Sequence, residues 1–189
     1  ALAAGHDLTL LARDRTKAPP ARERLRIVDG DVTNRVPLDE AMRGQDAVIS
    51  ALGRGMSFKS EHLIERSVPG ILAAMQTAGI KRLMFTSAFG VGDSYRDAPI
   101  VPKLFFRTLL SGIYADKAIG EDLIRGSGLE WTIVQPVQLT DGPLTKTYRA
   151  GERLQTAGMA KISRADTAHF ILDRLNDRAT IGKTLVIAH

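Results

Sequence analysis

The sequence predicts an α/β protein with a doubly wound parallel sheet, and three observations support this fold class. Short apolar runs alternate with helical patterns along all 189 residues, as they do in parallel sheets covered by helices. Several runs are apolar at consecutive positions, which suits strands buried on both faces. The composition is 44% hydrophobic and 25% charged with no cysteine, typical of a globular protein whose core forms without disulfides.

Six apolar runs are the expected strands, and helical patterns fill the intervals between them. The strands are expected at residues 7–12, 25–32, 46–53, 81–90, 129–136 and 184–189, and the helices at 37–44, 60–79, 102–127 and 167–175. Gly79 ends the second helical pattern, and Ser163 with Asp166 resembles a capping box before the last one. We expect a single domain over residues 1–189, with residues 137–164 as a small lobe on the substrate side.

The chain opens with a helix-like turn, ALAAG, that leads directly into the first expected strand. In a doubly wound nucleotide-binding fold, a central strand and a glycine-rich phosphate loop come before that point. We therefore expect this first strand and loop to be absent from the sequence given, and about 15–20 residues to precede Ala1 in the intact protein. Without them, the sheet should have an open slot at its middle.

Composition argues against several classes of function. No apolar run approaches the length of about 20 residues that spans a bilayer, and the start lacks the order of a secretion signal, so we expect a cytoplasmic protein without a membrane partner. The net charge of +5 comes from interleaved signs, which gives no support for nucleic-acid binding. The four histidines are scattered, so we expect no metal. A basic excess between Leu144 and Arg164 is either solvated surface or an attraction for an anionic ligand.

The ends of the first two expected strands carry charged residues that suit a dinucleotide. Arg13 follows the first run, where an arginine fork accepts the 2′-phosphate of NADP. Asp14 beside it keeps NAD open, and a plain charged turn is the alternative. Asp31 and Val32 end the second run and could meet an adenine, although Asp31 could equally cap a turn.

The next two strand ends offer glycines and hydroxyls. Gly53 and Gly55 follow a strand and precede a helical pattern, where glycine lets the backbone approach a phosphate or ribose. Thr86 and Ser87 stand at the carboxyl end of a buried strand, the edge at which open α/β sheets place their ligands. The Ser87 hydroxyl could bind a substrate carbonyl or the nicotinamide, or it could satisfy backbone donors at the strand end.

One helical stretch carries Tyr114 and Lys117, which are three residues apart and so share a helix face. An ammonium at this spacing could lower the pKa of the phenol and make it a proton donor. An aromatic ring that packs inward beside a surface lysine is the alternative.

Taken in order, the segments LTLLARD, GDV, QDAVISALG, SAF, SGLEWTIVQP and ISRADTAHF resemble the atypical short-chain dehydrogenases. Within them, the chain is similar to the NAD(P)H-binding group that contains NmrA-like proteins and the flavin reductases of the biliverdin reductase B type. The resemblance implies a Rossmann-like fold. It covers nearly the whole chain and keeps the order of the segments.

The resemblance also implies a role for each strand end. Arg13 would hold the 2′-phosphate and Asp31 with Val32 the adenine. The ribose and pyrophosphate would lie at Ala51, Leu52 and Gly53. The nicotinamide side would lie at Thr86, Ser87 and Ala88. Pro136 and Val137 would close over the nicotinamide. Two departures stand out. Tyr114 and Lys117 are three apart, whereas short-chain dehydrogenases have them four apart, and Gln138 replaces a histidine of the flavin reductases.

The leading hypothesis is an enzyme, an NADPH-dependent reductase that passes hydride to a planar acceptor such as a flavin or a tetrapyrrole-like compound. Ser87 would orient the acceptor or nicotinamide, Gln138 would line the substrate pocket, and Tyr114 with Lys117 would be the candidate proton donor. The alternatives are a non-catalytic NADP sensor of the NmrA-like kind and a sugar-nucleotide epimerase or dehydratase. The expected partner is a small molecule, and both a monomer and a homodimer are open.

Overall fold

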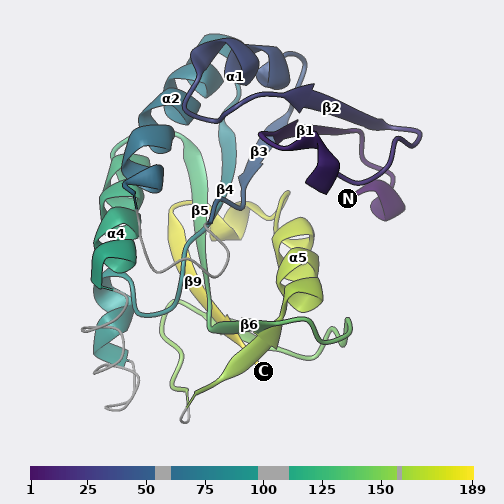
Figure 1. The fold of residues 1–189 in the computed structure, drawn as a ribbon. Helices are drawn as coiled ribbons and strands as arrows, with labels where there is room; N and C mark the ends of the chain where they lie inside the picture. Colours follow the sequence, from purple (N-terminus) through teal and green to yellow (C-terminus); the bar gives the residue numbers. More distant parts are fainter. Residues whose placement is uncertain (54–60, 98–110, 157–158) are drawn as a thin grey trace.

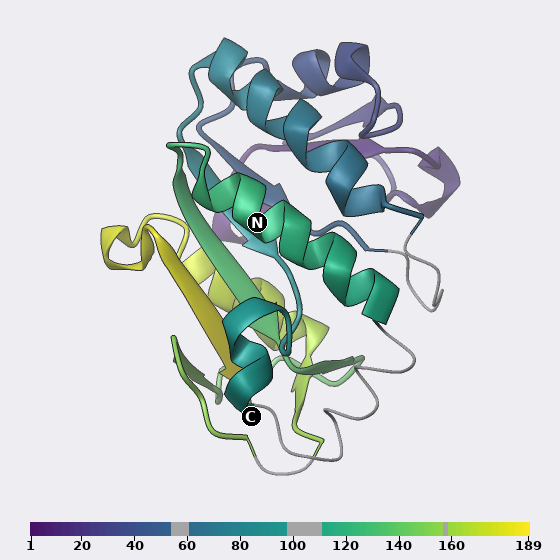
Figure 2. The ribbon, with the colours of Figure 1, turned by 90° about the vertical axis from the view of Figure 1, so that its left-hand side faces the viewer.

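The structure is a computed structural model that describes residues 1–53, 61–97, 111–156 and 159–189. The main sheet lies between two helical layers (Figure 1). On one face lie α2 (Leu63–Ala78) and α4 (Ser111–Arg125), which run side by side in Figure 2, and on the other lies α5 (Arg164–Asp173). The predicted α/β class with a predominantly parallel sheet is therefore confirmed.

The strands of the described chain form one five-stranded sheet and two separate pairs. The sheet has the order β3 (Ala47–Ser50), β4 (Arg82–Thr86), β5 (Glu130–Pro136), β9 (Lys183–Ala188) and β7 (Arg149–Gly151), the last antiparallel to β9. The pairs are β1 (Leu8–Ala12) with β2 (Leu25–Asp29) and β6 (Gln138–Thr140) with β8 (Lys161–Ser163), both parallel. Helix α1 (Arg35–Met42) packs beside α2. The described chain also contains four short 3₁₀ helices, η1 (Leu2–Ala4), η2 (Arg15–Lys17), η3 (Gly92–Asp97) and η4 (Arg178–Thr180).

Two hydrophobic clusters lie on opposite faces of the main sheet. Leu83 and Phe85 of β4 join the cluster under α1, α2 and α4, whereas Met84 between them joins the cluster under α5. Ile133 and Val134 of β5 divide in the same way. Successive side chains of a strand point to opposite faces, so continuous apolar runs are what a sheet covered on both faces requires.

All six predicted strands are present, with ends that differ by a few residues. The predicted helix stop is confirmed at Gly79, which adopts a left-handed φ of 71° and donates its N–H to the Gln76 carbonyl. The predicted cap is confirmed at Ser163, whose hydroxyl accepts the backbone N–H of Asp166 at 2.9 Å. Three short strands, β6, β7 and β8, lie in the segment 137–164, which was expected to form a lobe.

The second strand is shorter than predicted. It ends at Asp29, and the chain then turns over residues 31–34, where the Asn34 N–H donates to the Asp31 carbonyl at 2.9 Å. A Cβ on Gly30 would lie 2.3 Å from the Cβ of Pro37, so this glycine allows the start of α1 to approach the strand end.

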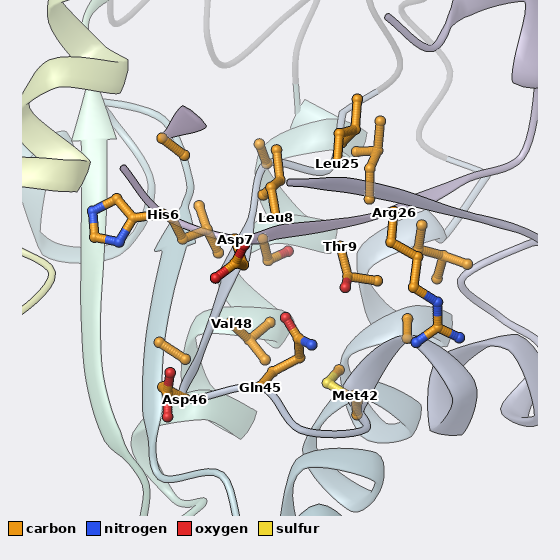
Figure 3. Close-up of a pocket in the computed structure, with 18 of the residues that line it drawn as sticks. His6, Asp7, Leu8, Thr9, Leu25, Arg26, Met42, Gln45, Asp46 and Val48 are labelled. Atoms are coloured by element: carbon orange, nitrogen blue, oxygen red, sulfur yellow. The ribbon is translucent and has the colours of Figure 1, made fainter. Parts of the chain in front are cut away.

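The pair β1–β2 is not hydrogen-bonded to the five-stranded sheet in the described chain. A cavity of about 1000 Å³ lies between β1 and β3 (Figure 3). None of the described helices has the length and apolar character needed to cross a membrane.

Candidate cofactor and active site

The carboxyl ends of β3, β4 and β5 meet at one edge of the sheet, because these strands are parallel neighbours. The segment after β4 continues along β5 beyond the last strand residue. The backbone N–H of Ser87 donates to the Val134 carbonyl at 2.8 Å, and that of Phe89 donates to the Pro136 carbonyl at 3.0 Å. Residues 86–88 are thereby fixed at the edge where α/β sheets bind ligands.

Three side-chain hydroxyls at this edge are buried and have no hydrogen-bond partner among the described residues. They belong to Ser50, Thr86 and Ser87, of which Ser50 is 6% exposed and Ser87 is 5% exposed. A buried hydroxyl without a partner costs about 1–3 kcal/mol, so such groups occur where a ligand completes the bonding. Thr86 and Ser87 were predicted site residues, whereas Ser50 was not.

Arg13 differs from the other two cations that follow β1. Arg15 bonds Asp29 at 2.7 Å and Lys17 bonds Asp14 at 3.3 Å. Arg13 reaches the Asp31 carboxylate only at 3.9 Å, and its side chain is 80% exposed. Its guanidinium is therefore accessible from solvent. The sequence predicted that this group binds the 2′-phosphate of NADP.

Asp31 is engaged in a turn, which was the alternative explanation for this residue. Its Oδ1 accepts the backbone N–H of Thr33 at 2.8 Å and the Thr33 hydroxyl at 2.7 Å. These hydrogen bonds, with smaller contributions from Arg13 and Arg66, hold the pKa of the Asp31 carboxyl below its usual range. Val32 beside it packs against the cluster under α1 and α2. The other Asp31 carboxylate oxygen lies 3.9 Å from the Arg13 guanidinium.

The segment after β3 combines exposed and packed residues. Ala51 and Gly53 are exposed, whereas Leu52 packs against the core, and Ala51 with Leu52 lines the end of the cavity beside β3. Gly55, the second predicted glycine, lies outside the described residues.

The carboxyl end of β5 is buried, and so is the residue that follows it. Pro136, the last residue of β5, is buried, and Val137 is 7% exposed and packs in the cluster under α5. The Val137 N–H donates to the Ile187 carbonyl at 3.2 Å, which ties the segment to β9. Gln138 begins β6 and is exposed, so its amide is accessible from solvent. Ala88, between the buried Ser87 and Phe89, is half-buried.

Tyr114 contacts the segment that carries Ser87. Its hydroxyl donates to the Phe89 carbonyl at 2.9 Å, and burial raises the pKa of the phenol. Of the two alternatives for this pair, the structure favours the packed ring, because burial of the phenol is the cause of its raised pKa. Burial also lowers the pKa of Lys117 itself, against the opposing charges of Glu121 and Asp116.

A buried polar network that sequence reasoning missed lies behind this edge. Gln135 is 1% exposed and donates from its Nε2 to the Glu121 carboxylate at 2.8 Å and to the Val91 carbonyl at 3.1 Å. Arg125 pairs with the other Glu121 oxygen at 2.6 Å. The network joins α4 to β5 and to the segment after β4, so it supports the position of the site.

Three further groups come together at the start of α2. The ligand atoms of His62, Glu65 and Asp116 lie within 4.8 Å of one another. However, the Asp116 oxygens accept the backbone N–H groups of Ile64 at 3.1 Å and Glu65 at 2.8 Å, and His62 bonds Glu65 at 2.7 Å. Asp116 therefore caps the start of α2, and the His62–Glu65 pair lies beside this cap.

The basic segment between Leu144 and Arg164 is partly neutralised. Arg164 bonds Asp141 at 2.6 Å, and Glu152 bonds Lys183 at 3.3 Å. Lys146, Arg149 and Lys161 are exposed. They leave a positively charged surface beside β6 and β7.

A parallel sheet between helical layers, with unpartnered buried hydroxyls at its carboxyl edge, is typical of Rossmann-type dinucleotide-binding proteins. Residues 1–178 match the NAD(P)H-binding family, and the chain belongs to this family.

One curated protein is similar in sequence. The chain is 27% identical over 143 residues to the "Uncharacterized sugar epimerase YhfK" of Bacillus subtilis, a match that covers 74% of this chain and 61% of that protein. The chain thus spans less than two thirds of this relative's length.

Solved structures show the same fold. A Rossmann-fold NAD(P)-binding family protein from Shigella flexneri has a TM-score of 0.72 and 27% identity, over 97% of this chain and 80% of that one. A short-chain dehydrogenase/reductase from Veillonella parvula, in complex with NADP, has a TM-score of 0.80 and 20% identity, over 97% and 82%. The anaerobilin reductase ChuY from Escherichia coli O157:H7 has a TM-score of 0.71 and 20% identity, over 87% and 75%.

Proposed function

We propose that the protein is an NADPH-dependent reductase that transfers hydride to a planar acceptor, such as a flavin or a tetrapyrrole-like compound. The observation that carries this proposal is the set of unpartnered buried hydroxyls of Ser50, Thr86 and Ser87 at the carboxyl edge of β3 and β4. A nicotinamide carboxamide and a ribose both offer the donors and acceptors that such hydroxyls need. The residues present therefore fit the cofactor of the family.

Arg13 supports NADP over NAD. Its side chain is 80% exposed and its carboxylate partner lies 3.9 Å away, so the guanidinium can turn to a 2′-phosphate at little cost. Asp31 and Val32 would hold the adenine, and Ala51, Leu52 and Gly53 would lie along the ribose and pyrophosphate.

The hydride is supplied by the reduced nicotinamide when the cofactor is bound. Thr86, Ser87 and Ala88 would bind the nicotinamide side, and Pro136 and Val137 would close over it and exclude water. Tyr114 keeps its proton, because its hydroxyl is already bonded to Phe89 and burial raises its pKa. Reduction of the acceptor consumes one hydride and one proton, and we assign that proton to water that enters beside the exposed Gln138.

Because Tyr114 keeps its proton and water supplies the proton instead, the site favours a flavin-like acceptor. An isolated carbonyl needs a strong proton donor when hydride arrives, whereas a flavin spreads the charge over its own ring system. The exposed Lys146, Arg149 and Lys161 would attract the phosphate or carboxylate groups of such an acceptor.

A steady-state assay of NADPH oxidation with FMN tests the proposal, with Arg13→Ala and Arg15→Ala as a matched pair. The Arg13 variant should raise the KM for NADPH by roughly tenfold or more and leave the KM for NADH unchanged. The Arg15 variant should leave the KM for NADPH and the KM for NADH unchanged, because the Arg15 guanidinium already forms a salt bridge with Asp29 at 2.7 Å. No turnover above the rate without protein would contradict the reductase, and equal effects on both cofactors would contradict the role of Arg13.

A non-catalytic NADP sensor is the second candidate, and the engagement of Tyr114 by Phe89 favours it. Calorimetry that shows NADP binding, combined with no NADPH oxidation across FMN, riboflavin and biliverdin, would support the sensor over the reductase.

A sugar-nucleotide epimerase is the third candidate, because one relative bears the name of an uncharacterized sugar epimerase. Conversion of UDP-glucose to its epimer, followed by proton NMR, would support it. The absence of any conversion would leave the first two candidates.

A further inference from the structure

A buried carboxylate holds an imidazole at the carboxyl end of β9. Asp166 of α5 is fully buried, and His189, which follows β9, places its Nε2 3.2 Å from the Asp166 Oδ2. The Asp166 Oδ1 accepts the backbone N–H groups of Thr145 at 2.9 Å and Lys146 at 2.7 Å. These bonds fix the carboxylate, and the carboxylate in turn orients the imidazole.

The rest of this imidazole is open to a ligand. The His189 side chain is 38% exposed, and Asp166 is the polar partner that it contacts among the described residues. Burial raises the pKa of Asp166, but hydrogen bonds from Lys146, Ser163 and Thr145 lower it to about 2, so the carboxylate is an anion at neutral pH. A carboxylate that orients an imidazole, with the second nitrogen left open, is an arrangement that presents a cation or a proton to a ligand.

His189 lies at the same edge of the sheet as Ser87. β4, β5 and β9 are parallel neighbours, so all three end at the carboxyl edge. The His189 N–H donates to the Lys161 carbonyl at 3.2 Å, and Lys161 is opposite Gln138 in the β6–β8 pair. Figure 1 shows the C-terminus beside β6. With strands about 4.8 Å apart, the backbone of β9 lies about 10 Å from that of β4.

This width matches a planar acceptor of three fused rings. An acceptor that stacks on a nicotinamide at Thr86–Ala88 would extend across β5, and its far ring would lie toward β9. In a flavin, hydride adds to N5 of the central ring, and the negative charge collects at N1 and the C2 carbonyl of the pyrimidine ring. A cation placed beside that ring stabilises the reduced flavin and the transition state that leads to it.

The charged groups around His189 favour an anion at this end of the edge. Lys161 of β8, Arg149 of β7 and Lys146 before β7 are exposed, and Arg149 is opposite Ala188 in the β7–β9 pair. Asp166 of α5 carries the negative charge among these groups, and it is fully buried beneath the imidazole. An acceptor therefore meets cations here.

We propose that His189, as an imidazolium held by Asp166, stabilises the negative charge that forms on a flavin ring when the ring accepts hydride. This inference rests on the proposed reductase function. The hydride leaves NADPH, which becomes NADP⁺, and forms the N–H bond at flavin N5, so the ring gains one negative charge. Water beside Gln138 then protonates N1, while His189 keeps its proton and its contact with Asp166.

Steady-state rates of NADPH oxidation with FMN between pH 6 and 9 test the charge of residue 189. His189→Gln removes the charge, so its kcat at pH 6 should fall about fivefold. The wild type should lose a similar factor as the pH rises, because imidazole ordinarily titrates near neutral pH. His189→Lys stays positive throughout this range, so it should keep the kcat of the wild type at pH 6 and show no such loss.

His169→Gln is the matched control. His169 lies on the same helix as Asp166, but its Nδ1 bonds the Tyr148 hydroxyl at 2.7 Å. This variant should leave kcat and its pH dependence unchanged.

Riboflavin provides a readout that needs no turnover. At pH 8 its photoreduced form carries a negative charge on the ring, whereas the oxidised form is neutral, and neither form has a phosphate. Under anaerobic conditions, His189→Lys should bind photoreduced riboflavin about fivefold more tightly than His189→Gln does. The two variants should bind oxidised riboflavin equally.

The outcomes separate this inference from the proposed function. Equal affinities of the two variants for photoreduced riboflavin, or an unchanged kcat in His189→Gln, would overturn the role of His189 and leave the reductase intact. A KM in His189→Gln that rises for FMN but not for riboflavin, with kcat unchanged, would assign His189 to the phosphate and would also overturn it. No turnover by the wild type above the rate without protein would overturn both.

Discussion

Ser87 and Val134 are joined by a backbone hydrogen bond of 2.8 Å, while the Ser87 hydroxyl has no partner among the described residues. The backbone of Ser87 therefore extends the hydrogen bonding of the sheet, and its hydroxyl can form a hydrogen bond with a ligand. This division separates the structural and functional roles of one residue, so that substitution can test them independently.

Ser87→Ala should impair catalysis and leave stability nearly unchanged. No hydrogen bond of the side chain is lost, so the free energy of unfolding should change by less than about 0.5 kcal/mol. If the hydroxyl orients the nicotinamide or acceptor, kcat should fall roughly tenfold. Urea unfolding and initial rates with NADPH and FMN measure the two effects.

Ser163→Ala is the matched control for Ser87→Ala, since Ser163 is also a buried serine but caps α5. It should lose about 1 kcal/mol of stability and leave the KM for NADPH unchanged. If Ser87→Ala is instead the more destabilised variant, its hydroxyl has a structural role and the assignment to the site fails.

Tyr114→Phe should not alter the pH dependence of the rate between pH 6 and 9. Burial raises the pKa of Tyr114, so the phenol stays protonated throughout this range and contributes no titration there. The variant loses the bond to the Phe89 carbonyl, at a cost of about 1 kcal/mol in unfolding free energy. Rate profiles of both proteins, together with urea unfolding, provide the measurement. A limb of the profile that disappears in the variant would show that Tyr114 titrates during turnover.

The sequence predicted the long strands of the fold but not the short ones. Strands such as β4 were visible because helices cover both faces and make consecutive residues apolar, from Leu83 to Phe85. The three-residue strands β6, β7 and β8 carry no such run, because two of their three residues are exposed in β6 and β7. They depend on pairing with distant segments, which local patterns do not encode.

Candidate site residues were predicted near the ends of the apolar runs, but Ser50 was not among them. Ser50 lies inside the predicted strand 46–53, and only the structure shows that β3 ends at this residue with its hydroxyl unpartnered among the described residues. Gln135 and Glu121 are 14 positions apart, so their buried hydrogen bond had no signal in spacing. Asp31 had two interpretations, and only coordinates could show the turn with Thr33.

Asp166→Asn should lower the melting temperature by more than about 5 °C. Burial raises the pKa of Asp166, but hydrogen bonds from Lys146, Ser163 and Thr145 outweigh it and lower the pKa to about 2. An asparagine has one oxygen and cannot accept all of these bonds. Asp141→Asn is the control, because that side chain is 90% exposed and should change the melting temperature little.

The same carboxyl predicts a dependence of stability on pH. Its pKa is about 2 in the folded protein and about 3.9 in an unfolded chain. The stabilisation by Asp166 is therefore complete above about pH 5 and is lost as the pH falls toward 2. Melting curves between pH 3 and 7 should show a smaller difference between the wild type and Asp166→Asn at the lower pH. A constant difference would contradict the lowered pKa.

Arg82→Met should destabilise the fold without changing cofactor affinity. Arg82 is 9% exposed and begins β4, at the opposite end of the strand from Ser87. Its guanidinium donates to the carbonyls of Leu175, Glu130 and Arg174 and to the hydroxyls of Thr132 and Thr180, at 2.7 to 3.2 Å. These bonds join β4 and β5 to the segment after α5.

Methionine fills much of the same volume but donates nothing, so it leaves several buried oxygens without partners. The unfolding free energy should fall by about 3 kcal/mol, since each such group costs about 1–3 kcal/mol and the site can partly relax. Lys81→Met, at the exposed neighbouring position, should change stability by less than about 0.5 kcal/mol. Titration with NADP should give the same Kd for all three proteins. An unchanged Kd is expected because Arg82 and the carboxyl edge are separated by the whole length of β4, which is packed on both faces. A weaker Kd for Arg82→Met alone would contradict this and would mean that the two ends of the strand are coupled.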